Sequence, residues 1–85
     1  MGRIEETITA YQNAVAILRE TGDRQREGRT LIGLGDALRL MDRLDEAIIA
    51  HQDAAEILGE AGDRHGETLA LTRLESDRAV QEPED

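Results

Sequence analysis

The chain has 85 residues, a formal net charge of −9 and a single aromatic residue, Tyr11. The surplus of negative charge argues against nucleic acid as a partner, because Lys and Arg supply most of the affinity for phosphate backbones. Without Phe or Trp the core must be filled by Leu, Ile, Val and Ala, which favours packed helices over a sheet.

The composition also limits the kinds of site and the location. The sequence has no Cys, which excludes disulfides and thiolate metal sites. It has no apolar run long enough for a signal peptide or a membrane span. We therefore expect a soluble, cytoplasmic protein with no membrane partner.

The sequence repeats itself at an offset of forty residues. The stretch ILRETGDRQREGRTL, from Ile17 to Leu31, returns as ILGEAGDRHGETLAL, from Ile57 to Leu71. A fixed period of this size indicates a repeat architecture, in which one unit cannot bury its apolar face alone and stacks on a neighbour.

Apolar residues recur every three or four positions along each copy, which is the spacing of one face of a helix. In the first segment these residues are Ile4, Ile8, Tyr11, Val15 and Leu18. The pattern predicts helices over residues 3–21, 24–41, 44–61 and 64–79. Together they form one domain over residues 1–79, followed by a disordered acidic tail at 80–85.

The predicted turns between these helices are very short. Gly22 and Gly62 suit the left-handed residue that ends a helix, and Asp42 tolerates the same conformation at the middle turn. Asp23 and Asp63 follow as caps of the next helices. Turns this tight make neighbouring helices antiparallel, so the repeated GDR is interpreted as architectural rather than as a site.

With these elements the sequence resembles the tetratricopeptide repeat family, in the long variant of about forty residues known from kinesin light chains and bacterial signalling regulators. The residues at the signature positions of the first-type helix are Leu31, Leu34, Gly35 and Leu38, with Leu71 and Leu74 in the later copy. Those of the second-type helix are Ala47, His51 and Ala54, with Thr7, Tyr11 and Ala14 in the earlier copy.

The resemblance implies an all-α fold, an α-solenoid fragment of antiparallel helical hairpins. In this frame the chain begins with a second-type helix and ends with a first-type helix. One complete pair, residues 24–61, is therefore flanked by two half repeats. Glu75 occupies the close-packing position filled by Gly35 one copy earlier, so no following helix is expected to press on it.

No residues have the spacing of a catalytic or metal site, so we expect no enzyme activity, no metal and no cofactor. The GLG at Gly33 to Gly35 lacks the third glycine and the preceding strand of a dinucleotide-binding loop. His51 lies on an apolar stripe and is expected to pack there, and neither His51 nor His65 has a second ligand at helical spacing.

The resemblance implies a protein or peptide partner, bound on a concave face made by the first-type helices. The candidate residues on that face are Arg29, Ile32, Gly33, Asp36, Arg39, Leu69, Thr72, Arg73 and Ser76. The known binding schemes of the family do not transfer, because Ile32 and Asp36 stand where a carboxylate clamp needs Lys and Asn. Solvated residues on a spacer segment are the alternative.

The first helix lacks the partner that would precede it, and we expect its exposed strip to mediate self-association. The candidate residues are Ile4, Thr7, Ile8 and Tyr11. Two arrangements are open, a two-fold dimer and head-to-tail stacking. Glu75 and Arg78 place bulky charged side chains on the surface that stacking would bury, which favours the dimer. The chain is thus predicted to be a non-enzymatic interaction scaffold; the alternative is a peptide-binding groove within a larger bacterial regulator.

Overall fold

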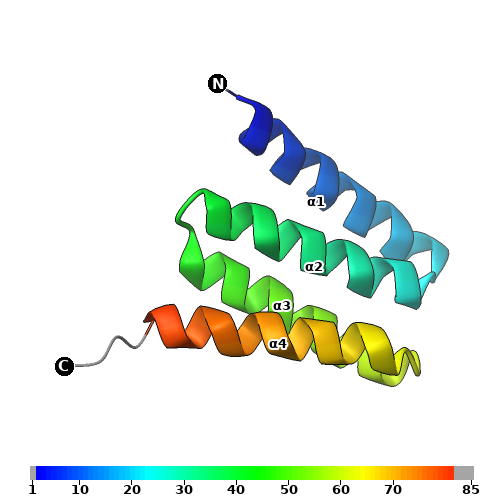
Figure 1. The fold of residues 1–85 in the computed structure, drawn as a ribbon. Coiled ribbons are helices and arrows are strands. Elements are labelled where there is room, and N and C mark those ends of the chain that lie inside the picture. The colour runs from blue at the N-terminus through cyan, green and yellow to red at the C-terminus, as the bar shows by residue number, and fades with distance from the viewer. Residues whose placement is uncertain (1, 82–85) are drawn as a thin grey trace.

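The computed structural model describes residues 2–81, which form four α-helices and no strand. The helices are α1 (Arg3–Thr21), α2 (Arg24–Leu40), α3 (Leu44–Glu60) and α4 (Arg64–Gln81). Figure 1 shows α1 against one side of α2, while α3 and α4 lie on the other side. The predicted all-α fold of four helices in a repeat is confirmed.

The helix bounds differ from the predicted ones mainly at the C-terminal end. The helices α2 and α3 each end one residue earlier than predicted, at Leu40 and Glu60. The helix α4 continues to Gln81, two residues beyond the predicted bound of 79. There the Gln81 side-chain amide donates to Asp45 Oδ1 of α3 at 3.3 Å, which ties this end to its neighbour. The rest of the expected tail, 82–85, lies outside the described residues.

The turns between helices use the left-handed backbone that the sequence indicated. Gly22 and Gly62 both have φ of 78°, and Asp42 has φ of 60°. The equal angles at the two glycines show that the two copies end their second-type helices in the same way. This conformation costs a side chain about 1 kcal/mol or more, which glycine avoids.

The aspartates that follow these glycines cap the next helices, as predicted. The Asp23 carboxylate accepts a hydrogen bond from the Arg26 backbone N–H at 3.2 Å. The Asp63 carboxylate accepts one from the Gly66 backbone N–H at 2.9 Å. Each cap satisfies a donor that has no partner within its own helix.

The core lies along both sides of α2 and is made almost entirely of aliphatic side chains. Its fully buried members include Ala47, Ala54, Leu58 and Ala70, each at 0% exposure. The alanines on α3 let its backbone come close to α2, and α2 has glycines at the matching places. A side chain at Gly28 would meet Leu58, and one at Gly35 would meet His51. Contact between α2 and α3 therefore depends on the absence of side chains.

We expect Gly28→Ala to destabilise the protein, because the added Cβ meets Leu58 at 2.5 Å and the interface cannot relax without moving a fully buried side chain. Overpacking of this kind costs about 1–3 kcal/mol in the free energy of unfolding. Urea denaturation followed by circular dichroism measures it.

The matched control is Gly59→Ala on α3, where the nearest atom is the flexible carboxylate tip of Glu67. Here the gain in helix propensity should dominate, leaving stability unchanged or higher by about 0.5–1 kcal/mol. Equal effects of the two substitutions would contradict the close-approach account.

Candidate functional site

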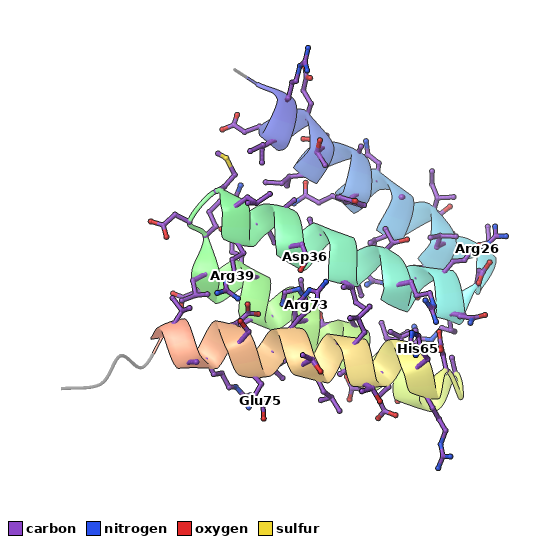
Figure 2. All side chains as sticks on the ribbon, in the orientation of Figure 1. Arg26, Asp36, Arg39, His65, Arg73 and Glu75 are labelled. Atoms are coloured by element: carbon purple, nitrogen blue, oxygen red, sulfur yellow. The ribbon has the colours of Figure 1, made fainter. Side chains whose placement is uncertain are left out.

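The predicted concave residues lie on α2 and α4, and several of them meet between these helices. Figure 2 shows Asp36 of α2 and Arg73 of α4 facing each other, with Arg39 further along α2. The Arg73 Nε donates to Asp36 Oδ1 at 3.1 Å. The structure thus brings together residues that are 37 positions apart in the sequence.

A second ion pair crosses from α2 to α4 beside the first. The Arg39 Nη1 donates to Asp77 Oδ1 at 2.9 Å and to Ser76 Oγ at 3.0 Å. Asp77 is completely buried, and sequence reasoning missed it. The available signal was its position forty residues after Ala37, where an acidic side chain replaces a core alanine.

His51 of α3 lies between the two ion pairs and contacts the aspartate of each. Its ring is completely buried against Gly35, so the expectation that it packs in the core is confirmed. Its nitrogens also make polar contacts: Nδ1 lies 2.5 Å from Asp77 Oδ2, and Nε2 lies 3.2 Å from Asp36 Oδ1. Within residues 2–81 no group of three His, Asp or Glu side chains is arranged to hold a metal ion.

These five side chains, Asp36, Arg39, His51, Arg73 and Asp77, are called the charge cluster below. They come from three helices, and each acidic group contacts both a guanidinium and the imidazole. Because the charges of Arg39 and Arg73 are already satisfied within the chain, the cluster joins α4 to α2 and α3 rather than presenting free charges.

Arg29, a further concave candidate, is also used within the chain. Its Nε and Nη2 donate to the Asp63 carboxylate at 2.6 and 3.0 Å. These bonds, with the Gly66 backbone N–H and the Gln25 amide, hold the pKa of Asp63 well below its ordinary value of 3.8. The pair fastens α2 to the turn between α3 and α4.

The remaining concave candidates do not form one groove. Ile32 is only 6% exposed and belongs to the core. Gly33 faces the ring of Tyr11 on α1. Leu69 is half-buried against the core, whereas Thr72 is exposed on α4.

Two of the four residues expected in the exposed strip on α1, Ile8 and Tyr11, are covered instead. Ile8 is only 3% exposed, and Tyr11 is half-buried with its ring over Gly33. Both residues lie on the side of α1 that packs on α2, so they are already covered within the chain. Ile4, at 38% exposure, and Thr7 remain accessible.

Comparison with the second copy shows which side of α1 is uncovered. Ile17 is 60% exposed, whereas Ile57, forty residues later on α3, is 7% exposed. Thr7 and Ala10 are likewise exposed where Ala47 and Ala50 are buried. The side formed by Thr7, Ala10, Ala14 and Ile17 is called the open α1 face below.

The outer side of α4 is also uncovered but has a different character. Thr68 and Glu75 stand where α2 has Gly28 and Gly35, the two glycines that admit α3. Glu75 is exposed, and Figure 2 shows it pointing away from the other helices. Side chains at both positions oppose the close approach that α3 makes to α2.

The four helices form two antiparallel hairpins that repeat at an offset of forty residues. The turns between the helices contain a residue with left-handed backbone at Gly22, Asp42 and Gly62. The sequence model of the family described as tetratricopeptide repeat matches residues 1–60. The chain belongs to the tetratricopeptide repeat family. No curated protein and no solved structure matches the chain. Repeats of this family generally mediate protein–protein interaction and are typically non-catalytic. Among the described residues, no helix is long and apolar enough to cross a membrane.

We expect Arg29→Met to raise the pKa of Asp63 toward 3.8, because Arg29 is the largest cause of its low value. Because the pKa of Asp63 is lowered in the fold, its contacts stabilise the protein at any pH above its ordinary pKa. This stabilisation is lost as the pH falls below that value and through the lower pKa of the folded state. Carboxyl ¹³C chemical shifts followed from neutral pH into acid measure this titration.

The control for this substitution is Arg26→Met, which removes an exposed arginine that pairs with Asp23 on the same helix. It should leave the Asp63 titration unchanged. An unchanged Asp63 titration in Arg29→Met itself would show that the ion pair does not set this pKa.

Proposed function

We propose that this tetratricopeptide repeat is a non-catalytic interaction module that forms a two-fold dimer through the open α1 face. The observation that carries the proposal is the contrast between Ile17 and Ile57, which are 60% and 7% exposed at equivalent positions. In the second copy this face is covered by a closely packed helix, whereas within residues 2–81 no helix covers the equivalent face of α1. Ile17 continues a strip of small residues that includes Ala10 and Ala14, and a contiguous uncovered strip of this kind favours association.

The shape of the face suits a second copy of itself. Its small residues Thr7, Ala10 and Ala14 alternate at spacings of three and four, so two α1 helices can approach closely. In an antiparallel arrangement, Thr7 of one copy lies beside Ile17 of the other, and Ala10 lies beside Ala14. An isologous contact of this kind closes after two copies.

The charges at the ends of α1 support the antiparallel direction. Arg3 lies at the start of the open α1 face, and Glu20 lies beside the far end of this face, next to Thr21. Neither forms an ion pair within residues 2–81, so each is available to the other copy. In the register that sets Thr7 beside Ile17, Arg3 of each copy lies opposite Thr21 of the other, where its long side chain can reach the neighbouring Glu20, twice per dimer.

Head-to-tail stacking is less well supported. It would place α1 of one copy on α4 of the next, in the way that α3 packs on α2. Thr68 and Glu75 obstruct that contact at the two places where α2 has glycine. Burying the Glu75 carboxylate without a partner would carry a further cost.

The concave face is the weaker candidate for a binding surface. Its charged residues Arg29, Arg39 and Arg73 already pair with Asp63, Asp77 and Asp36. A peptide that used these charges would have to displace internal hydrogen bonds. The proposal of a peptide-binding groove within a larger bacterial regulator therefore rests on the resemblance alone.

The forty-residue offset of the repeat supports membership in the long variant of the family.

We expect Ile17→Glu to dissociate the dimer, because it places a charge in the centre of the apolar contact. Sedimentation velocity over a concentration series measures the association. The matched control is Ile49→Glu on α3, where the isoleucine is 58% exposed but lies outside the open α1 face. The proposal fails if the unmodified chain is monomeric throughout the series, or if Ile49→Glu dissociates the dimer equally.

We expect charge reversal at either end of α1 to weaken the dimer, and reversal at both ends to restore it. Arg3→Glu or Glu20→Arg alone sets like charges against each other, which should raise the dissociation constant about two- to fivefold per exposed pair. Double reversal re-forms both pairs. Failure of the double variant to recover affinity would contradict the antiparallel direction but leave dimerisation through α1 intact.

A further inference from the structure

The buried ring of His51 lies between two carboxylates. Its Nδ1 is 2.5 Å from Asp77 Oδ2, and its Nε2 is 3.2 Å from Asp36 Oδ1. An ionised carboxylate only accepts hydrogen bonds, and a neutral imidazole has a single N–H to donate. With both carboxylates ionised, both contacts are hydrogen bonds when both ring nitrogens carry protons. The arrangement therefore suits the imidazolium form of His51.

The charged groups around the ring come from the two helices packed against it. The helix α2 contributes Asp36 and Arg39, and α4 contributes Arg73 and Asp77. The side chains of Arg39 and Arg73 are 33% and 40% exposed and remain partly hydrated, whereas His51 and Asp77 are completely buried. The Asp77 carboxylate, which water cannot reach, thus depends on Arg39 and the His51 ring for its hydrogen bonds.

We propose that the charge cluster is a proton-dependent latch that holds α4 against α2 and α3. With both ring protons present, His51 donates to one helix on each side. When one proton is lost, a nitrogen lone pair faces a carboxylate oxygen, and the attachment of α4 weakens. Rising pH therefore loosens α4, and falling pH fastens it.

The first copy of the repeat supplies an internal reference for this latch. Tyr11 occupies the position equivalent to His51, and Ala37 occupies the position equivalent to Asp77. The junction between α1 and α2 therefore has no imidazole and no buried acid at these places. The two junctions share one architecture but differ in their proton chemistry, so only α4 is expected to respond.

Backbone amide hydrogen exchange on the intact chain tests the latch. Between about pH 6 and about pH 9, a range in which an accessible histidine loses its charge, the protection factors of α4 amides should fall by about ten- to a hundredfold. That range corresponds to one charge-assisted hydrogen bond. Amides of α1, which contributes no residue to the charge cluster, report the reference junction and should change far less.

The ring protons themselves are visible in ¹H–¹⁵N correlation spectra of the histidine side chains. At about pH 6 both nitrogens of His51 should carry a proton. His65, which is exposed on α4 and is labelled in Figure 2, gives the signals of an unburied histidine in the same sample. A single N–H on His51 under these conditions would overturn the proposal.

A conservative variant separates the latch from a general effect of pH. In Asp36→Asn the side-chain amide can donate to Nε2 of a neutral ring, so α4 protection should no longer depend on pH. Asp36 is 41% exposed, which makes the substitution compatible with the fold. The matched control is Asp53→Asn, an exposed position on α3 outside the cluster, which should keep the full dependence.

Two exchange results would also overturn the latch. One is constant protection of α4 across the pH range in the unmodified chain. The other is an undiminished pH dependence in Asp36→Asn. If Asp36→Asn does not fold, the ring spectra of the unmodified chain still decide between one and two protons on His51.

Discussion

The structure depends on the close packing of α2 between helices on two sides. None of the four helices in residues 2–81 can bury its apolar face alone, because each aliphatic stripe needs a neighbouring helix to cover it. Gly28 and Gly35 bring α2 near enough to α3 for alanines to fill the interface, and Gly33 admits the ring of Tyr11 from α1. The remaining contacts follow from this central helix.

The two copies have the same architecture, but they differ in how the second-type helix packs on the helix that follows it. Between α1 and α2 the ring of Tyr11 rests on a glycine. Between α3 and α4 the equivalent position is His51, held by Asp36 and Asp77. Burying an ionic group is costly unless every polar atom has a partner, and within the described residues no buried side-chain nitrogen or oxygen lacks one. The polar junction therefore has a partner for each of its buried polar atoms.

The uncovered surfaces also differ, and the difference bears on function. The open α1 face presents small residues and Ile17, which suits close contact with another helix. The outer side of α4 presents Thr68 and Glu75, which oppose such contact. Repeats of this family generally mediate protein–protein interaction. In this member we propose that the open α1 face is the interaction surface, rather than the concave face, whose charges are paired within the chain.

The sequence alone determined the helices, their turns and the repeat, because these depend on local spacing and on residues such as Gly22 and Asp23. Only the tertiary structure decided which side of each helix is covered. Ile8 and Ile17 both look like members of an apolar face, yet one packs on α2 and the other is exposed, since the covered side depends on which neighbour is present. The sequence placed Asp36, Arg39 and Arg73 on one predicted face, but their pairing and the burial of Asp77 depend on partners on other helices, which are distant in sequence.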